Sequence, residues 1–365
     1  MLMISSWPSN DYENQYMTLY YRALREYGVV LGPPALIDDR FVRAHGNEID
    51  VIQIQWTPEQ IWRSRGTSVW AQARGVAGLR AYFRLAHSRG IKIVWTLHDA
   101  EPHEHRKWLD DLGYRVLSRQ ADLCIVHDAW AAEQFERRFG GNRNKVRIME
   151  HGNYDGVFPP GRPREETLRD LCVDRSSRVL LCQGNIRPYK RYDLAIDVAT
   201  RLGKGYHLII AGGPPEPSFG AEVRRHAGTA QNVTLLLENQ PAQTVSDLFT
   251  ACDCFLLPYD KITGSGALLT AATLGRGVVA SDLPYFRRIT APEPDAAVLF
   301  KPGSLRALEE GIREFFTKDV RRRHEASRRL ADRVPWPKVV KPVVDWLTKT
   351  FPNRMRDLPG DFRTK

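Results

Sequence analysis

Short apolar runs alternate with amphipathic stretches along the first half of the chain. The runs at 49–56 (IDVIQIQW), 91–99 (IKIVWTLHD) and 121–128 (ADLCIVHD) have the length and content of buried β-strands. Between the first two, residues 69–90 place apolar side chains at roughly helical spacing, with arginines between them. A strand, a helix and a strand in this order predict a parallel sheet with crossover connections.

The same alternation restarts after a proline- and charge-rich stretch at 155–175, where we place a domain junction. Beyond it we expect strands at 178–185, 206–215, 232–238, 253–260 and 277–282, and helices at 192–202, 244–252, 267–275 and 307–316. The amphipathic stretch 336–351 is expected to pack back on the N-terminal domain, ahead of a loose polar tail. The pattern predicts an α/β protein with two Rossmann-like, doubly wound parallel-sheet domains facing a cleft, at 1–160 and 161–335, followed by 336–365.

The composition supports a globular chain with two domains. It has 365 residues, of which 42% are hydrophobic and 26% are charged. No run of about 18 apolar residues indicates a transmembrane helix, and the first residues do not read as a secretory signal. The five cysteines lie mostly in apolar, strand-like runs without metal-binding spacing, so we expect reduced thiols and a cytoplasmic protein.

The positive charge is unevenly distributed. The net charge is +10, and residues 301–365 hold 17 Lys or Arg against 9 Asp or Glu. Residues 61–120 hold 11 against 5. Such a balance favours an anionic partner, namely nucleotide phosphates, anionic lipid headgroups or nucleic acid, although a solvated basic surface would give the same count.

The run GNIRPYKRYDLAI contains the strongest candidate for binding chemistry. Gly184 follows a predicted strand, and Arg187 and Lys190 come before the next helix begins. Carboxyl ends of strands point into the ligand crevice of such sheets, and two cations three residues apart suit a diphosphate. They would also stabilise charge on a departing nucleoside diphosphate. The alternative is a solvated basic loop.

A glycine-rich turn precedes the predicted helix at 267–275. Gly264, Ser265 and Gly266 would present free backbone N–H groups and the positive end of a helix dipole, which suits a phosphate. A G-x-G turn by itself is a weak signal, and a plain strand-to-helix turn would look the same. The turn matches neither the Walker nor the dinucleotide-binding glycine pattern.

Acids and histidines gather where the strand at 91–99 ends. His98, Asp99 and Glu104 are our candidates for the group that takes a proton from an acceptor hydroxyl. A structural hydrogen-bond cluster would use the same residue types. The spacing fits no common zinc pattern, so we expect no metal site.

Two further turns are candidates for ligand contact at the cleft. His151 and Asn153 follow a short apolar run near the domain junction, where a simple turn is an equal alternative. Asn14 and Tyr16 follow the first apolar run of the chain and are expected near the same cleft.

These motifs, in this order, resemble the family 4 glycosyltransferases (glycosyl transferases group 1) and related bacterial enzymes that build exopolysaccharides and lipid-linked oligosaccharides. The resemblance is strong from about 176 to 316, where GNIRPYKRYDLAI, TVSDLFTACDCFLLPYD and GSGALLTAATLGRGVVASD match the family's runs. It implies the GT-B fold and a nucleotide-diphosphate sugar as co-substrate, with no other cofactor. It also implies that Arg187 and Lys190 bind the donor diphosphate.

One departure from the family pattern concerns donor recognition. The family has two glutamates eight positions apart, and aligning the downstream glycine and VVAS run places Ile262 and Thr270 there. A threonine hydroxyl still hydrogen-bonds a ribose, without charge assistance. Asp260, beside Tyr259 at the end of the strand at 253–260, is a nearby acid that substitutes in this reading. The chain is interpreted as a diverged branch.

The predicted function is the transfer of a hexose-type sugar from a UDP- or GDP-linked donor to a lipid-linked or polysaccharide acceptor. We favour inversion slightly over retention, and the basic groups make a metal unnecessary. Aromatic residues interleaved with arginines suit a membrane interface or sugar stacking, so we expect peripheral contact with the anionic inner leaflet. The residues meant are Trp56, Trp62, Trp70, Tyr82 and Phe83 with Arg63, Arg65, Arg74, Arg80 and Arg84, and core packing is the alternative for each aromatic.

Other classes fit the sequence less well. A nicotinamide-dependent oxidoreductase would need G-x-G-x-x-G at a strand end, and a nucleic-acid binder would need a recognisable reading module; neither is found, so no nucleic acid is expected. A catalytically silent nucleotide-sugar binder remains open because of the two missing glutamates. An epimerase or a phosphorylase of the same fold is a further alternative.

Overall fold

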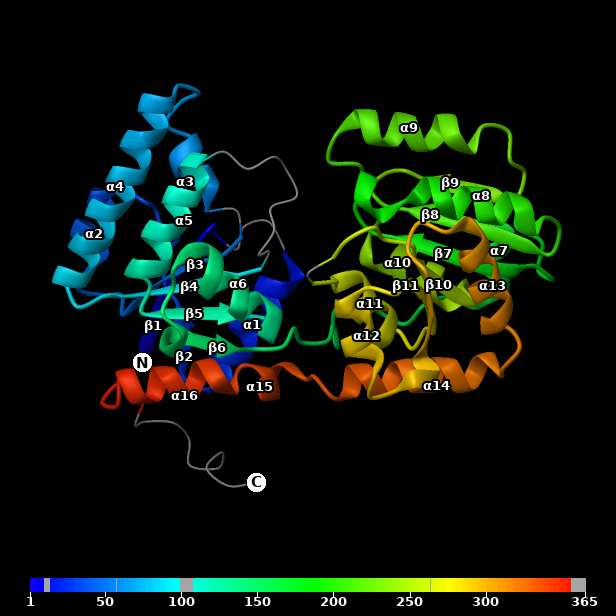
Figure 1. Cartoon of the computed structure of the whole chain (residues 1–365). Coiled ribbons are helices and arrows are strands. Elements are labelled where there is room, and N and C mark those ends of the chain that lie inside the picture. Colours follow the sequence, from blue (N-terminus) through cyan, green and yellow to red (C-terminus); the bar gives the residue numbers. More distant parts are fainter. Residues whose placement is uncertain (10–13, 57, 99–107, 263, 356–365) are drawn as a thin grey trace. The chain divides into compact units, whose positions relative to one another are not determined.

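The chain alternates strands and helices throughout the computed structural model, which describes residues 1–9, 14–56, 58–98, 108–262 and 264–355. The described residues divide into two compact units (Figure 1). Unit 1 contains residues 1–152 together with 336–365, and unit 2 contains residues 153–335. The chain therefore leaves unit 1 after Gly152 and returns to it at Trp336.

Unit 1 is built on a parallel sheet whose described strands run in the order β2-β1-β3-β4-β5-β6. The strands are β1 (Leu2–Trp7), β2 (Val29–Leu31), β3 (Val51–Ile54), β4 (Lys92–Leu97), β5 (Leu123–Val126) and β6 (Val146–Ile148). The helices are α1 (Gln15–Glu26), α2 (Asp39–His45), α3 (Glu59–Arg63), α4 (Val69–Ser88), α5 (Trp108–Gln120), α6 (Ala129–Phe139), α15 (Trp336–Val339) and α16 (Lys341–Thr350), with a 3-10 turn, η2 (Arg143–Lys145).

Unit 2 repeats this plan with the strand order β12-β11-β10-β7-β8-β9. The strands are β7 (Arg178–Gln183), β8 (Tyr206–Ala211), β9 (Val233–Leu236), β10 (Cys254–Leu257), β11 (Val278–Ser281) and β12 (Ala297–Phe300). The helices are α7 (Arg164–Asp170), α8 (Tyr192–Leu202), α9 (Pro217–Ala227), α10 (Ala242–Ala251), α11 (Gly266–Thr273), α12 (Pro284–Thr290), α13 (Leu305–Phe315) and α14 (Val320–Asp332), with 3-10 turns η3 (Pro188–Lys190) and η4 (Pro294–Ala296).

The sheet of unit 2 is buried on both faces. Along β7, Leu180 and Cys182 pack into one apolar cluster with α8, α9 and α13. The alternate residues Val179 and Leu181 pack into a second cluster with α10, α11 and α12. Because successive strand residues point to opposite faces, a strand covered on both sides is apolar at every position, which explains the unbroken run VLLC.

The boundary after Gly152 lies eight residues before the expected end of the N-terminal domain at 160. The segment that follows is fixed to unit 2 by its own hydrogen bonds. Asn153 N–H donates to the Val334 carbonyl at 2.9 Å, and Tyr154 N–H donates to Thr273 Oγ1 at 2.9 Å. The turn at 153–155 thus belongs to the second unit, although its composition resembles a linker.

The C-terminal segment belongs to unit 1 through Trp336, which is only 4% exposed. Its indole packs against the rings of Tyr16, Tyr20 and His151. A Cβ on Gly152 would collide with the same indole, so this position needs a glycine.

Candidate functional site

The loop after β7 brings its two predicted cations to the carboxyl end of the sheet of unit 2. Gly184 adopts φ +117°, a conformation that favours glycine, and turns the chain out of the strand. Ile186 N–H donates to the Gly213 carbonyl, which ties this loop to the one that follows β8. The single turn of η3 then presents Arg187 and Lys190 before α8 begins.

Lys190 is buried, with 7% of its surface exposed, and its ammonium pairs with no carboxylate in the described part of the chain. The Nζ atom lies 5.7 Å from the ring centre of Tyr259, and a Cβ on Gly184 would approach it to 3.0 Å. Burial, reinforced by the neighbouring Arg187, lowers the pKa of Lys190 to about 8. A buried cation without a counter-ion is a candidate binding group for an anionic ligand.

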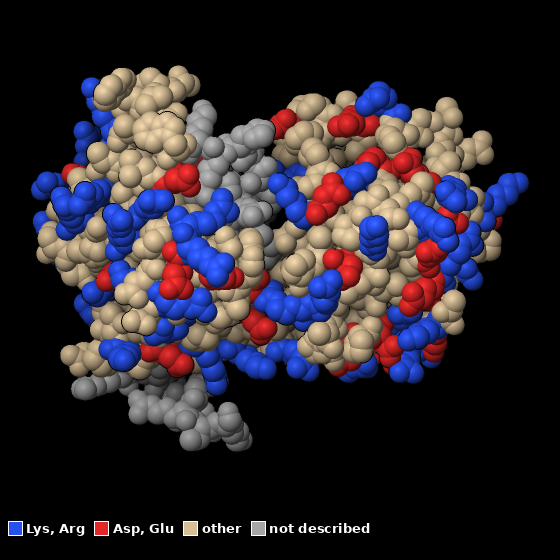
Figure 2. Space-filling view, in the orientation of Figure 1, with Lys and Arg blue, Asp and Glu red and all other residues tan. Residues whose placement is uncertain are grey.

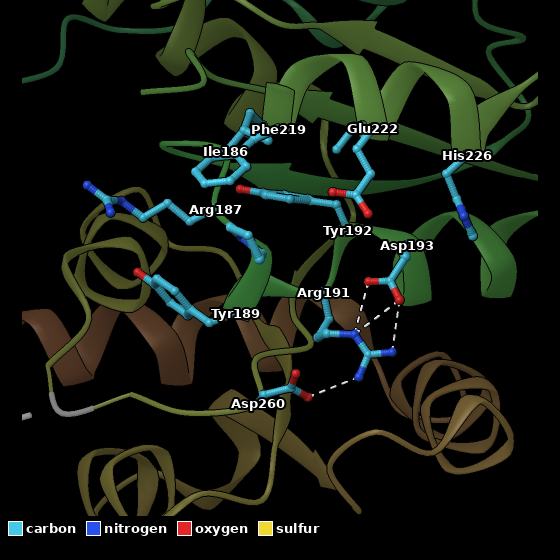
Figure 3. A pocket seen from close by; sticks show the side chains of 12 residues that line it. Ile186, Arg187, Tyr189, Arg191, Tyr192, Asp193, Phe219, Glu222, His226 and Asp260 are labelled. Atoms are coloured by element: carbon cyan, nitrogen blue, oxygen red, sulfur yellow. Dashed lines mark hydrogen bonds and ion pairs between the residues drawn. The ribbon is translucent and has the colours of Figure 1, made fainter. Parts of the chain in front are cut away.

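Arg187 and Arg191 differ in their partners. The Arg187 guanidinium forms no ion pair with the described acids, and in Figure 3 it points away from its neighbours. Arg191 lies between two carboxylates, with Asp193 at 2.8 Å and Asp260 at 3.1 Å. Arg191 itself adopts φ +50°, a left-handed conformation that is uncommon for a residue other than glycine. Asp260, our candidate ribose acid, is thus already paired.

A pocket of about 370 Å³ opens beside this loop, between the start of α8 and α9 (Figure 3). Arg187, Tyr189 and Asp260 form part of its wall, and Phe219 and Glu222 of α9 lie across from them. Of the residues predicted from this loop, Arg187 lines the pocket, whereas Gly184 and Lys190 are not among its lining residues.

The glycine-rich turn forms the start of α11. Ser265 is the N-cap, and its Oγ accepts from Leu268 N–H at 3.2 Å. The N–H groups of Gly266 and Ala267 have no acceptor within the described chain, so they remain available to an anion. Gly266 also needs its glycine, because a Cβ there would lie 2.7 Å from the Tyr154 hydroxyl.

Thr270 is a poor substitute for a carboxylate in this arrangement. Its hydroxyl donates to the Gly266 carbonyl at 2.9 Å, within the helix. The residue is also buried. Recognition of a donor hydroxyl by Thr270 would require this hydrogen bond to be shared or exchanged.

Two other predicted residues lie near this turn. Gly264 belongs to the turn itself. The ring of Tyr259 packs edge to face against that of Tyr189, with 5.7 Å between the ring centres.

In unit 1 the predicted His98 and His151 belong to a cluster of three histidines. His98 follows β4, His127 follows β5 and His151 follows β6. His127 Nε2 lies 3.2 Å from His98 Nδ1, and the ring of Tyr16 meets all three imidazoles edge to face. Trp56 stacks on His98 at 4.0 Å between ring centres. We call His98, His127 and His151 the histidine cluster.

The hydrogen bonds of the histidine cluster form a chain. His127 Nδ1 donates to the Met149 carbonyl at 2.8 Å, and His98 Nε2 lies 2.8 Å from Gln55 Oε1. Because His127 donates from Nδ1, its neutral ring accepts at Nε2 from His98 Nδ1–H. A neutral His98 then accepts at Nε2, which requires the Gln55 side chain to present its amide nitrogen there. Burial, with the neighbouring imidazoles, lowers the pKa of His98, and burial lowers that of His151 to about 3. Both rings are therefore neutral at pH 7.

Two other predicted residues have structural roles here. Asn14 is the N-cap of α1, where its side chain accepts from Tyr16 N–H at 3.0 Å. Asn153 is buried in unit 2 and donates to Asp155 and to the Ala331 carbonyl. Asp99 and Glu104 lie outside the described residues. Among the residues described, no group of three His, Cys, Asp or Glu could hold a metal ion.

Sequence reasoning missed His127, Gln55 and Tyr154. His127 had a visible signal, because CIVHD repeats the strand ending of WTLHD and the neighbouring strands pair Leu97 with Val126. Equivalent positions on adjacent parallel strands lie side by side. Tyr154 had no such signal, since its approach to Gly266 joins positions more than 100 residues apart.

Most of the aromatic residues expected on a basic surface are in the core instead. Trp62, Tyr82 and Phe83 are fully buried in the apolar core of unit 1. Trp70 alone of the five is largely exposed, at 80%. Packing within the core therefore decides the place of aromatic positions that the sequence pattern leaves ambiguous.

Comparisons with known proteins agree with this geometry. The model of the family described as glycosyl transferases group 1 matches residues 163–332. GDP-mannose:glycolipid 4-beta-D-mannosyltransferase of Xanthomonas campestris pv. campestris is 26% identical over 293 residues, which cover 76% of this chain and 73% of the relative. The lipopolysaccharide core biosynthesis mannosyltransferase LpsB of Rhizobium meliloti is 25% identical over 305 residues, or 80% of each chain.

Solved structures share the fold of the whole chain. Anabaena HepE in complex with UDP-glucose has a TM-score of 0.72 at 15% identity, covering 96% of this chain and all of HepE. WaaG, a glycosyltransferase involved in lipopolysaccharide biosynthesis, has a TM-score of 0.62 at 16% identity, covering 95% of this chain and all of WaaG. The chain is therefore a glycosyltransferase with the GT-B fold, and its residues 163–332 match the glycosyl transferases group 1.

Proposed function

We propose that unit 2 binds a nucleoside diphosphate sugar and that the chain transfers its hexosyl residue to a hydroxyl of a glycolipid or polysaccharide acceptor at the cytoplasmic face of a membrane. The observation that carries the proposal is the pair of cations after β7. Lys190 is buried without a counter-ion, and Arg187 is unpaired within the described chain. The relatives that act on glycolipids by name support the acceptor class.

In this proposal the cations act mainly on the leaving group. As the bond between C1 of the sugar and the diphosphate oxygen breaks, negative charge grows on the diphosphate. Arg187, Lys190 and the open N–H groups of α11 stabilise that charge in place of a metal ion. We therefore expect transfer to continue in the presence of EDTA.

The acceptor oxygen attacks C1 from the opposite face, which inverts the configuration. Its proton passes to a base in the segment that begins at His98, for which His98, Asp99 and Glu104 are the candidates. His98 is neutral at pH 7, as a base must be, and because its Nδ1 donates to His127 it takes up the proton at Nε2 when the bond to Gln55 opens. The beta linkage in the name of the Xanthomonas relative is consistent with inversion in a related chain.

The first donors to test are GDP-mannose and UDP-glucose. GDP-mannose stands in the name of a relative that matches 76% of this chain, and UDP-glucose is bound in a solved structure of the same fold. Binding of one nucleoside diphosphate at 100 times its Kd should stabilise the folded chain by about 2.7 kcal/mol. Thermal unfolding with GDP, UDP, ADP and TDP, with NAD as a control, reads this out directly.

Transfer is then measured with the radiolabelled donor and a glycolipid extract as acceptor. We expect labelled lipid to appear in the organic phase with the wild-type chain. Lys190→Ala should lower the rate of transfer by about 10²-fold or more. Stabilisation by no nucleoside diphosphate would contradict the donor site itself.

A second candidate is a nucleotide-sugar binder without catalysis. Two observations favour it: Asp260 is paired with Arg191, and the Thr270 hydroxyl is bonded within α11. Such a protein would bind the donor as tightly as an enzyme. It would show neither transfer nor hydrolysis of the sugar with any acceptor fraction, which separates it from the first proposal.

A further inference from the structure

Helices α4 and α5 of unit 1 are held side by side by one buried tryptophan. The Trp62 side chain lies between Gly75 of α4 and Gly113 of α5, and a Cβ on either glycine would come within 2.9 Å of it. Trp62 Nε1 donates to Asp110 at 2.9 Å, and Arg63 pairs with the same carboxylate. The two helices therefore form one rigid surface, and both begin at the same end of unit 1 (Figure 1).

The solvent-facing side of α4 starts with an aromatic residue and continues with arginines. Trp70 is 80% exposed, and Val69 beside it is exposed as well. Arg74, Arg80 and Arg84 follow on the exposed side, separated by the small residues Ala77, Gly78 and Ala81. The helix has 20 residues and contains no acid, so nothing on it neutralises the arginines.

Helix α5 repeats this order on its exposed side. Trp108 is 64% exposed and Leu112 is 45% exposed. Arg115 and Arg119 follow at helical spacing and are exposed. None of the arginines named on the two helices forms an ion pair with a described acid. The amphipathic surface formed by the exposed residues of α4 and α5 thus has an apolar end and a basic body; we call it the α4–α5 surface.

The arginine-rich helix of unit 2 is different. On α14, Arg322 pairs with Asp295, Arg328 with Asp155, and Arg329 with Glu293. Acids of other segments thus neutralise much of the basic surplus after residue 301. Figure 2 shows the contrast on the face it draws: tan covers the end of unit 1 where α4 begins, with blue side chains along the outer edge below it.

We propose that the α4–α5 surface docks on a bilayer rich in anionic phospholipid. Trp70, Trp108 and Leu112 enter the boundary between headgroups and acyl chains, where amphipathic indoles are favoured. The unpaired arginines bind lipid phosphates. A nucleic acid would use the charge and leave the tryptophan end exposed to water, so the apolar end favours the membrane. No described helix is long and apolar enough to cross the bilayer.

This inference rests on the proposed function in one respect, since a glycolipid acceptor places the substrate in the same bilayer. Docking itself requires no nucleotide and no acceptor. It is therefore tested on the full-length chain by sedimentation with vesicles of phosphatidylcholine alone or with 30 mol% phosphatidylglycerol, on the order of the charge density of an anionic leaflet.

Two variants address the two parts of the surface. The double variant Trp70→Ala/Trp108→Ala should lower the partition coefficient by roughly tenfold or more, because two indoles leave the interface. Arg80→Ala/Arg84→Ala should lower it by about 25-fold, at roughly fivefold for each arginine near an anionic surface. The matched control is Arg224→Ala/Arg225→Ala on α9, where two exposed arginines leave unit 2 and binding should not change.

The expected result is binding to anionic vesicles that falls with salt and is lost in both α4–α5 variants. Equal loss of binding in the α9 control would mean that net charge alone attracts the chain to the vesicles. Unchanged binding of the tryptophan variant would mean that the apolar end of the α4–α5 surface does not contact the bilayer. Either outcome overturns the proposal. So does tight binding of a duplex oligonucleotide with no vesicle binding. Thermal stabilisation by nucleoside diphosphate, measured on the same variants, stays intact if only docking fails, and is absent if the proposed function fails.

Discussion

At the scale of single residues, the proposed donor site depends on a lysine that the fold keeps buried and without an ion pair to a described acid. The pKa of Lys190, about 8, lies below the 10.5 of an ordinary lysine because burial disfavours the charged form. The ammonium is present below pH 8 and disappears above it. The same shift means that the unfolded chain binds more protons between pH 8 and 10.5, so stability rises with pH there.

We therefore expect affinity for the nucleoside diphosphate to fall by up to about tenfold between pH 7 and 9, as the protonated fraction of Lys190 drops. Titration calorimetry at several pH values measures this. Lys190→Arg should bind with little dependence on pH, because arginine stays charged. The exposed Lys204, exchanged for arginine, is the matched control and should keep the wild-type profile. A wild-type affinity that is flat across this range would exclude Lys190 as the titrating group.

Gly266 gives a second test at this scale. A Cβ there would lie 2.7 Å from the Tyr154 hydroxyl, at the N–H groups that we assign to the diphosphate. Gly266→Ala should weaken nucleotide binding by about tenfold, the equivalent of roughly 1.4 kcal/mol. Adding Tyr154→Phe removes the clashing oxygen and should restore most of the affinity. Normal binding by the single variant would show that the start of α11 does not touch the ligand.

At the scale of elements, the C-terminal segment completes the core of unit 1. Trp336 of α15 fills the space beside Gly152 and the rings of Tyr16 and Tyr20, and α16 adds buried valines behind it. All of unit 2 separates this segment from the rest of unit 1 along the sequence, so its contribution to unit 1 comes from tertiary packing alone. Apolar spacing in 336–351 indicated a packed face but not its partner.

Trp336→Ala should destabilise unit 1 by about 3 kcal/mol or more, since it removes a large buried side chain and leaves a cavity. Chemical denaturation followed by fluorescence measures the loss. Trp130 of α6, which is 38% exposed, is the matched control, and Trp130→Ala should cost well under half as much. Equal effects of the two variants would show that the C-terminal segment contributes no special packing.

At the scale of the whole molecule, two units with the same architecture have different chemistry at the carboxyl ends of their strands. Unit 2 presents cations and open N–H groups, which suit a diphosphate. Unit 1 presents neutral histidines and aromatic rings, which suit an uncharged hydroxyl-bearing group.

Hydrogen–deuterium exchange with and without the nucleoside diphosphate tests this division. Protection is expected in η3 with the start of α8 and in the start of α11, where the ligand would fix backbone groups. The histidine cluster in unit 1 should show no comparable protection until an acceptor is added. Nucleotide-dependent protection confined to unit 1 would reverse the assignment.

The sequence by itself determined the fold class and the family of the second half. Apolar runs such as VLLC and LIIA dictate strands covered on both faces, because each residue of such a run needs an apolar neighbour. The glycine, arginine and lysine after β7 also stood out, since their order along the chain already places them at a strand end.

Only the tertiary structure decided which polar groups are occupied and which are available. Arg187 and Arg191 look alike in sequence, yet Asp193 and Asp260 neutralise only the second. Trp62 and Trp70 both lie among arginines in the sequence, yet Trp62 is buried against two glycines and Trp70 faces solvent. His127 joins His98 because parallel strands in register place their ends together. The physical reason is common to all three: pairing and burial depend on neighbours that are distant along the chain.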